Sequence, residues 1–401
     1  MNNVLKNRTI CHLFILHIVF IFNCIDVGYC YEINRIFADP NLGLATRINF
    51  ALELASQKFD GKKILLVYTI SASNMELEQA TASELSNSNN KSLYQVLFED
   101  KQISGNKEKT STLLNDPKMQ ILQKTSPGDF NNAAEKNDPN KAFHSAHLAI
   151  ILDYSLESGR PCLYQVYFQN ISKSFNQEIR PMFWLGHTSS HESVEWLKYQ
   201  FYKSSQEKFK QQAIRAIGSH DCKEKVVEFS KKVLQGKQSL PLKAEAISLA
   251  GKSNTTDGLQ LLISTAIKNN NILLRKKALF ALSQVSNDKA HLVIATIAKK
   301  EKNIEVRKEA IFWLAQVANS ESVRILNEIM QKEADHRIRE YTLFAISQLP
   351  GSQSKPLLTT VALNDPIYHI RKKARLILKH SEDEKFMNFF DELVRDSDSP
   401  N

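Results

Sequence analysis

The stretch RKKALFAL at 275–282 recurs along the chain at a constant step. It returns as RKEAIFWL at 307–314, as REYTLFAI at 339–346 and as RKKARLIL at 371–378, each 32 residues after the last. Lys243 keeps this step toward the N-terminus, Lys210 keeps it after a one-residue shift, and we expect a degenerate copy near Phe183. A fixed period of this length is typical of stacked helical repeats.

Each repeat has the pattern of two helices joined by a short polar turn. In one unit, apolar residues at helical spacing form a first face and then a second face. The first face is Val306, Ala310, Trp313, Leu314 and Val317, and the second is Val323, Leu326, Ile329 and Met330. Such a hairpin cannot cover its own apolar face, so we expect stacked copies to share one continuous core.

Helix-capping residues recur with the same period. Ser239, Asn271, Asn303 and Asp335 each stand four residues before the basic anchor, where an N-cap is needed. Pro366 is expected at the first position of its helix, and Ser189 and Ser381 begin capping boxes. Alanines 278, 310 and 374 predict close helix approach, Thr342 is expected to bond the preceding turn, and the hairpin ending at 386–393 is predicted to cap the array.

Together these residues resemble HEAT repeats of the phycobilisome-lyase-like type. The resemblance is carried by IEVRKEA at 304–310 and DHRIR at 335–339, and it covers about 200–395. FWLG at 183–186 with SVEWL at 193–197 is also similar to uncharacterised exported bacterial HEAT-repeat proteins. The resemblance implies a right-handed α-solenoid that scaffolds or binds partners, and it does not imply lyase activity.

The N-terminus has the layout of a secretory signal peptide. Lys6 and Arg8 precede an apolar run at 10–22, and small Gly28 stands three positions before a cleavage point near Cys30. We therefore predict a leader at 1–30 and an exported protein, periplasmic or in the cell envelope or outside the cell, with no membrane span after cleavage. An uncleaved anchor is the alternative.

Residues 31–177 predict a small mixed α/β or mainly β module. Helical spacing marks 31–60, a β-branched run marks a strand at 63–70, and two runs at 147–154 and 162–168 predict a hairpin. The polar stretch at 101–142 predicts a loop insertion. The solenoid is assigned to 178–395 and a polar tail to 396–401. The fold class is thus mainly α, with this small module at its N-terminus.

Charge and cysteine content restrict the partners only loosely. The formal charge is +9, which favours an anionic partner without identifying it: nucleic acid, acidic glycans, lipid headgroups or an acidic protein. After the leader only Cys162 and Cys222 remain, and we expect two separate buried thiols rather than a disulfide framework.

A ladder of arginines is the most regular charged feature. Arg275, Arg307, Arg339 and Arg371 recur at the repeat period. They either present a row of guanidinium groups to an anion or bind acidic and carbonyl groups at the turns between repeats. The second interpretation is favoured.

Motifs of catalysis and metal binding are weak. The sequence has no GxSxG, Walker or GxGxxG motif, and the pairs His144/His147 and His187/His191 lack further ligands at metal spacing. Trp184, Trp196 and Trp313 fall at repeat-core positions. We therefore predict no catalytic residues, no metal and no cofactor, and no enzyme activity, although the N-terminal module leaves an unrecognised hydrolase open.

The sequence predicts an exported scaffold that binds a protein partner along a concave face. That face is expected to be lined by the second helices, at 258–267, 290–299 and 323–331. The candidate contact residues are Lys299, Lys300, Arg324, Asn327, Glu328 and Lys332. The alternatives are an enzyme positioned by the solenoid and a cytosolic solenoid that binds nucleic acid, which export would exclude.

Overall fold

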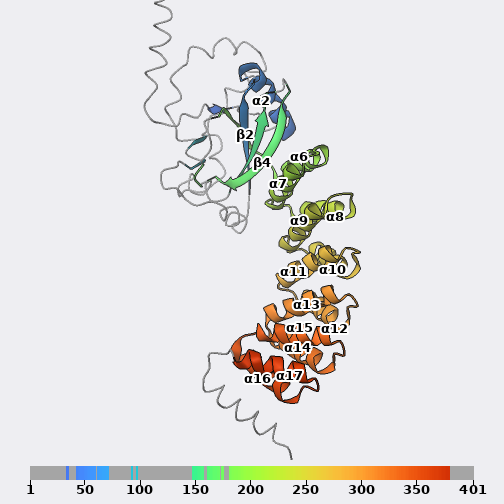
Figure 1. Ribbon diagram of the computed structural model, residues 1–401. Coiled ribbons are helices and arrows are strands. Elements are labelled where there is room, and N and C mark those ends of the chain that lie inside the picture. The colour runs from blue at the N-terminus through green and yellow to red at the C-terminus, as the bar shows by residue number, and fades with distance from the viewer. Residues whose placement is uncertain are drawn as a thin grey trace, which may run out of the picture. The chain divides into compact units, whose positions relative to one another are not determined.

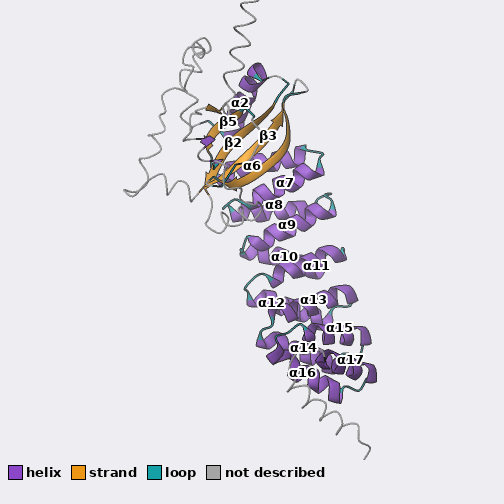
Figure 2. Cartoon of the chain, turned by 60° about the vertical axis from the view of Figure 1, so that its left-hand side comes forward, coloured by secondary structure: helices purple, strands orange, loops and turns teal. Residues whose placement is uncertain are grey.

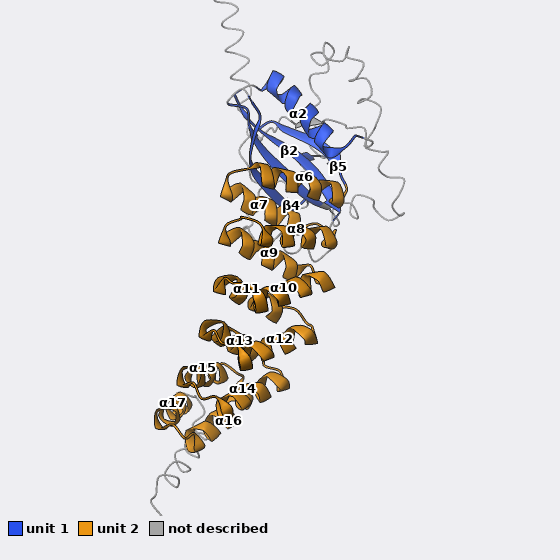
Figure 3. Ribbon diagram, turned by 90° about the vertical axis from the view of Figure 1, so that its right-hand side faces the viewer, with its two compact units in different colours: residues 1–188 blue, residues 189–401 orange. Residues whose placement is uncertain are grey.

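The chain forms two compact units that divide between Thr188 and Ser189 (Figure 3). The computed structural model describes residues 33–35, 42–59, 61–71, 92–93, 96–97, 147–157, 160–171, 173–175 and 180–379. The predicted leader, the insertion at 101–142, the capping hairpin with Ser381, and the tail at 396–401 lie outside the described residues.

The N-terminal unit contains a five-stranded mixed sheet in the order β1-β5-β2-β3-β4. Its strands are β1 (Ile33–Arg35), β2 (Lys63–Ser71), β3 (His147–Ser155), β4 (Cys162–Asn170) and β5 (Met182–His187). Strand β5 is parallel to both β1 and β2, whereas β2, β3 and β4 are antiparallel neighbours. The predicted strand at 63–70 and the hairpin after it are confirmed.

Both faces of the central strand are covered, which explains its continuous apolar sequence. Every residue from Ile64 to Ile70 is buried. Helix α2 (Leu44–Lys58) packs against β2 and β5 (Figure 2), and Phe59, just after it, meets Phe183 edge to face at 6.0 Å between ring centroids. On the other face Leu65, Val67 and their strand neighbours form a cluster with Leu93, Val96, Leu97, Ile171 and Phe175.

Two sequence predictions for this unit were wrong. Residues 33–35 form a strand rather than the start of a helix, so the helix of this region is restricted to α2. The run at 183–186 lies in strand β5 and starts no repeat. A short apolar run fits a buried strand as well as a buried helix. The boundary between the units therefore falls after Thr188 rather than at 178.

The C-terminal unit is a helical-repeat array. Its helices are α6 (Ser190–Lys203), α7 (Glu207–Gly218), α8 (Lys223–Gln235), α9 (Leu240–Lys252), α10 (Thr256–Lys268), α11 (Ile272–Ser283), α12 (Asp288–Lys300), α13 (Ile304–Val317), α14 (Ser320–Lys332), α15 (His336–Ser347), α16 (Gly351–Asn364) and α17 (Tyr368–Lys379) (Figure 1). From α7 onward we call the odd-numbered ones first helices and the even-numbered ones second helices. The repeat period is confirmed, because α11, α13, α15 and α17 begin 32 residues apart.

The repeats share one apolar core, as the sequence predicted. A continuous cluster of buried side chains runs from Ile247 to Leu378. Ala278, Ala310 and Ala374 are fully buried in it. Thr342 takes the place of alanine once, and its hydroxyl donates to the carbonyl of Ile338 at 2.8 Å, so the buried oxygen is satisfied.

Most of the predicted caps form. The side chains of Asn271, Asn303 and Asp335 accept backbone N–H groups of the first turn, and Ser189 accepts that of Glu192.

Two cap predictions were wrong. The Ser239 hydroxyl makes no cap and donates to Glu207 Oε1 at 2.6 Å. Helix α17 begins at Tyr368, two residues after Pro366, because the Asp365 carboxylate accepts the N–H of Ile367 and keeps this segment in a turn.

The array bends, and its first helices line the inner, concave side. Successive first helices pack against one another more closely than successive second helices do, as neighbours on the inside of a curve must (Figure 3). The prediction that second helices line the concave face was therefore wrong. A sequence period shows which residues share a helix face but not toward which side a stack of hairpins curves.

Candidate binding surface on the inner helices

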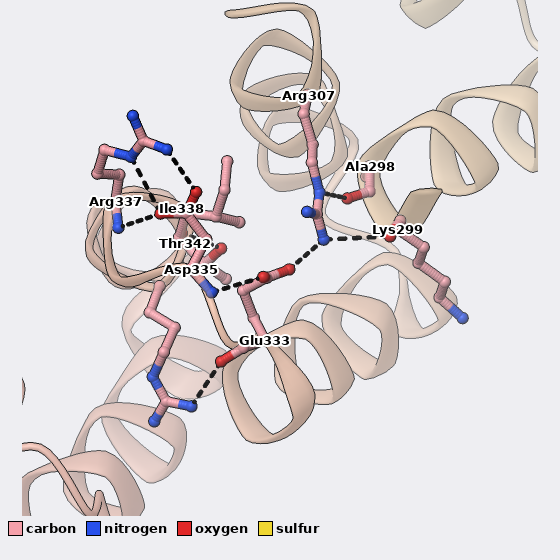
Figure 4. A network of polar contacts seen from close by, with 9 residues as sticks. Ala298, Lys299, Arg307, Glu333, Asp335, Arg337, Ile338 and Thr342 are labelled. Carbon is pink, nitrogen blue, oxygen red and sulfur yellow. Dashed lines mark hydrogen bonds and ion pairs between the residues drawn. The ribbon is translucent and has the colours of Figure 1, made fainter. Parts of the chain in front are cut away.

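The arginine ladder lies at the turns between repeats. Arg307 on α13 donates to the carbonyls of Ala298 and Lys299, at 2.9 and 3.1 Å, and forms an ion pair with Glu333 (Figure 4). Arg275 repeats this with Ala266 and Glu301.

The last two ladder members make related contacts. Arg339 bonds the Glu333 carbonyl and pairs with Asp365, and Arg371 donates to the Asp365 carbonyl at 2.6 Å. The ladder arginines thus bind backbone carbonyl groups at or just after the C-terminal ends of the second helices.

The acidic residue that pairs with each of the first three ladder arginines has a second role. Glu301, Glu333 and Asp365 each follow a second helix and accept the backbone N–H two residues later, at 2.8, 2.8 and 2.9 Å. For Glu301, burial acts to raise the pKa, but hydrogen bonds from Arg275 and from backbone N–H groups outweigh it and hold the pKa below its usual value. Each carboxylate joins a turn to the first helix that precedes it.

The predicted contact residues lie on α12 and α14, outside the concave face. Three of them converge on Glu328, with Lys299 at 2.6 Å, Lys332 at 3.4 Å and Arg324 at 3.7 Å. The hydrogen bond from Lys299 lowers the pKa of Glu328. Lys300 is exposed, and Asn327 accepts from Gln331 at 3.4 Å. These charges largely compensate one another on the outer surface.

The inner surface carries a stripe of apolar side chains that sequence reasoning missed. Phe280, Phe344 and Leu376 stand at the same repeat position and are 40%, 47% and 56% exposed. Phe312 occupies that position on α13 and is half-buried. We call Phe280, Phe312, Trp313, Tyr341, Phe344 and Leu376 the inner stripe. The signal was present in the apolar sixth residue of each quoted copy, which lies beyond the buried helix face.

Ring contacts join the stripe between α11 and α13 and order it within α13 and within α15. Phe280 of α11 lies 5.0 Å from Trp313 of α13, which also meets Phe312 edge to face at 4.9 Å between centroids. The Trp313 indole donates to Glu309 at 2.9 Å, which fixes its orientation. Tyr341 and Phe344 on α15 are 5.8 Å apart. Trp313 therefore packs partly on the core and partly in this surface.

A shallow groove of about 460 Å³ opens where the stripe crosses α13, α15 and α17. Apolar side chains form its floor, and three basic groups and one carboxylate stand around it. The lining residues are Lys308, Arg337, Glu340, Tyr341, Leu343, Phe344, Lys373, Leu376 and Ile377. An apolar floor with a charged rim is the arrangement that protein–protein interfaces use.

Charge is distributed unevenly along this surface. Helix α13 carries two acidic and two basic residues, whereas α17 carries five basic residues and no acidic one. On α13, Glu309 binds Lys276 at 2.9 Å. The ammonium of Lys308 stands 5.7 Å from the centre of the Tyr341 ring, a cation–π arrangement. Lys373 reaches Glu340 at 3.0 Å.

Polar groups buried in the N-terminal unit act in structural pairs. Arg47 of α2 donates to the carbonyls of Leu185 and His187 at 2.9 and 2.8 Å and so fixes the helix to the end of β5. The Asp153 carboxylate accepts two hydrogen bonds from Arg180, at 3.1 and 2.9 Å. These contacts join elements that are distant in sequence.

A buried serine–histidine pair has the hydrogen bond of a catalytic pair but not its access to a substrate. His220 Nε2 lies 2.7 Å from Ser193 Oγ, and its Nδ1 lies 2.7 Å from the Ala216 carbonyl. Both side chains are fully buried, so a substrate has no access to the hydroxyl. The pair connects α6 to the turn after α7.

The remaining predicted site residues are dispersed. His187 ends β5, His191 lies in the first turn of α6, and His144 lies outside the described residues. Within the described ranges, no three histidine, cysteine or acidic side chains gather as a metal site would require. No helix in that part of the chain has the length and apolar character needed to cross a membrane.

The cysteine and tryptophan predictions need two corrections. Both thiols are free, but Cys162 is exposed on the edge strand β4 rather than buried. Trp184 is buried in the sheet core rather than in a repeat core.

Comparison with known proteins shows likeness in fold alone. No protein-family model matches the sequence, and no curated protein matches it. Among solved structures, the complex of CpcE and CpcF of phycocyanin lyase from Nostoc sp. PCC7120 is 13% identical, with 57% of this chain and 92% of that chain covered and a TM-score of 0.29. Human deoxyhypusine hydroxylase in complex with glycerol is 14% identical, with 49% and 85% covered and a TM-score of 0.23.

These structures correct one expectation. The chain was predicted to be no enzyme because its motifs of catalysis and metal binding are weak. Both of these helical-repeat proteins are named as enzymes, a lyase and a hydroxylase, so the prediction is not supported.

Proposed function

We propose that this protein is an exported helical-repeat scaffold that binds a protein partner along the inner stripe. The observation that carries the proposal is the row of exposed apolar side chains at one repeat position, Phe280, Phe344 and Leu376. Contiguous apolar surface of this kind marks interaction sites in soluble proteins.

The composition of the stripe supports a protein partner. Aromatic side chains are enriched where binding energy concentrates in protein interfaces, and charged groups surround them as a rim. The three aromatic pairs of the stripe hold one another in place, so little conformational entropy is lost when a partner covers them. An inner surface also gives a bound segment contacts from several repeats at once.

Nucleic acid fits this surface less well. A phosphate backbone carries a uniform negative charge along its length. The inner helix α13 carries two carboxylates beside the stripe, the exposed Glu305 and the half-buried Glu309. A polyanion crossing α13 would meet these groups, whereas a protein segment can place apolar side chains there.

Export is the second part of the proposal. Its support is the leader pattern at 1–30, with basic residues, an apolar run and a small residue before the expected cleavage point. Sequencing the N-terminus of the mature protein tests it. A protein that begins near Cys30 or just after it is expected, and an intact Met1 in the cytosolic fraction would contradict export.

Site-specific crosslinking tests the binding surface. A photo-crosslinking residue placed at Phe344, on the inner stripe, is expected to capture a protein in the native host that the same residue at Arg324, on the outer α14, does not capture. The captured protein is then purified and its affinity measured directly. Phe344→Ser, which changes a half-exposed side chain, should weaken binding at least roughly tenfold, or about 1.4 kcal/mol. Equal affinity of the variant and the unaltered protein would overturn the proposal.

A further inference from the structure

We infer that the partner segment is an acidic amphipathic helix that lies across α13, α15 and α17, with its acidic end over α17. This inference rests on the proposed function and goes beyond it by assigning the chemistry and the direction of the bound segment. It is carried by the groove and by the uneven distribution of charge along the inner helices.

The groove requires the partner segment to present apolar side chains. Its floor consists of Tyr341, Leu343 and Phe344 from α15 and of Leu376 and Ile377 from α17. Its volume of about 460 Å³ accepts a few side chains rather than a folded domain. An amphipathic helix presents apolar side chains on one face at three- and four-residue spacing, which is how helices occupy such grooves.

The rim of the groove is close to balanced in charge, because each of its basic groups already has an acidic neighbour. Lys308, Arg337 and Lys373 stand around the groove with one carboxylate, Glu340. Lys308 lies 3.6 Å from Glu305, and Arg337 lies 2.8 Å from Asp335. Glu340 is already engaged by Lys373 and by His369, at 3.0 and 2.7 Å, and hydrogen bonding to Lys373 lowers its pKa. A carboxylate on the partner can therefore approach this rim without meeting an uncompensated negative charge.

The direction of the bound segment follows from the charges on α17. Arg371 and Arg375 of this helix bind the carbonyls of Asp365 and Ala362. Lys372 and Lys379 point to solvent, and no ion pair to either is present among the described residues. Helix α13, at the other end of the groove, is balanced between acidic and basic groups. Carboxylates on the partner therefore interact most favourably over α17, where Lys372 and Lys379 lie. Apolar or neutral residues interact most favourably over α13.

A second copy of this chain does not meet these requirements with the same face. Two copies paired through their α17 helices would place five basic residues against five, and like charges placed together in an interface are unfavourable. A segment of opposite charge suits this end of the groove better.

Designed peptides test the inference with the full-length mature protein. Three helical peptides share the same leucine and phenylalanine positions and carry glutamate, lysine or glutamine at their polar positions. Fluorescence anisotropy is expected to show that the glutamate peptide binds at least roughly tenfold tighter than the lysine peptide, or about 1.4 kcal/mol. Added salt should shrink this difference, because exposed charges are screened.

Charge-reversal variants locate the acidic end. Lys372→Glu combined with Lys379→Glu changes two exposed side chains on α17 and should weaken the glutamate peptide while improving the lysine peptide. Lys300→Glu combined with Lys332→Glu makes the same charge change on the outer α12 and α14 and should leave both affinities unchanged. A peptide with glutamates at one end only should lose affinity when its sequence is reversed.

The outcomes separate this inference from the proposed function. Equal binding of the glutamate and lysine peptides would overturn the acidic partner, while capture at Phe344 would still support the scaffold function. Binding that responds equally to the inner and outer charge reversals would overturn the placement on α17. A crosslink from position 376 to residues 381–401 of the same chain would overturn it as well, by showing that the chain's own acidic C-terminal segment occupies the groove. No capture at Phe344 would overturn the proposed function itself.

Discussion

Arg307 and Glu333 are 26 residues apart in sequence and form an ion pair where two neighbouring repeats meet. The arginine comes from the first helix of one repeat, and the glutamate follows the second helix of that same repeat. Because the arginine also binds the carbonyls of Ala298 and Lys299, one guanidinium group connects three consecutive helices (Figure 4). The pairs Arg275–Glu301 and Arg339–Asp365 repeat this spacing of 26 residues.

Removal of the Arg307 side chain should destabilise the helical array. Arg307→Ala leaves the carboxylate of Glu333 and two carbonyl groups without their donor, and the two side chains are only 17% and 11% exposed. We expect a loss of about 1–3 kcal/mol in the free energy of unfolding, measured by denaturant titration. Arg307→Lys keeps the charge but cannot reach all three acceptors, so it should recover only part of the loss.

The matched control is the exposed pair of Arg324 and Glu321, whose side chains are 62% and 61% exposed. Arg324→Ala should leave the stability nearly unchanged, because solvent screens an exposed ion pair. A double-mutant cycle of Arg307 and Glu333 should show a coupling energy that the cycle of Arg324 and Glu321 lacks. Equal coupling in both cycles would contradict the structural role of the ladder.

Close packing at one glycine gives a second prediction. A Cβ atom at Gly258, in the first turn of α10, would lie 2.4 Å from Ser253 Oγ and 2.5 Å from the carbonyl oxygen of Ala250. The carbonyl cannot move without disturbing α9, so Gly258→Ala should cost about 1–3 kcal/mol.

Gly351 provides a control at a similar position in α16. A Cβ atom there meets only the end of the Lys355 side chain, at 3.9 Å. Gly351→Ala should be neutral or slightly stabilising, because alanine favours a helix over glycine. Thermal unfolding of both variants measures the difference, and a similar melting temperature for the two would contradict the packing argument.

The cap at Asp335 predicts a pH dependence. Hydrogen bonds from the Arg337 side chain and from its backbone N–H hold the pKa of Asp335 at about 2, below the ordinary 3.8. A lowered folded-state pKa adds stability above the unfolded-state value, and this contribution is lost as the pH falls. The stabilisation should therefore be complete above about pH 4 and fade toward pH 2.

Asp335→Asn isolates this contribution, because asparagine retains the N-cap acceptor and removes the titrating charge. The difference in unfolding free energy between the unaltered protein and the variant should shrink between pH 4 and pH 2. A difference that stays constant over this range would show that the carboxylate charge contributes nothing to the cap.

The two thiols should differ in reactivity. Cys162 is exposed on β4, whereas burial raises the pKa of the Cys222 thiol to about 11, against the ordinary 9.0. The thiolate is the reactive species. Near pH 8, Cys222 should therefore hold on the order of a hundredfold less thiolate than a cysteine with the ordinary pKa. Maleimide labelling followed by mass spectrometry should modify Cys162 first in the folded protein. In denaturant the two rates should become similar, and equal rates in the folded protein would contradict the difference.

Local chemistry was sufficient to predict the repeat array. The recurrence of RKKALFAL, the capping asparagines and the apolar spacing all act within one or two helical turns, and the structure places the helices at the predicted period. The strand at 63–70 and the following hairpin were predictable for the same reason, since β-branched runs and turn residues determine them locally. The strand at 182–187 was missed, because its burial depends on pairing with β1 and β2.

The sequence by itself determined the period of the helical array and which faces of the repeat helices are buried, because helical periodicity acts between residues three and four apart. Only the tertiary structure decided that the first helices lie on the inside of the curve and that Phe280, Phe344 and Leu376 form one surface. It also decided that the arginines face the turns rather than a partner. Those outcomes depend on how hairpins stack, and stacking is set by contacts between residues about one repeat apart.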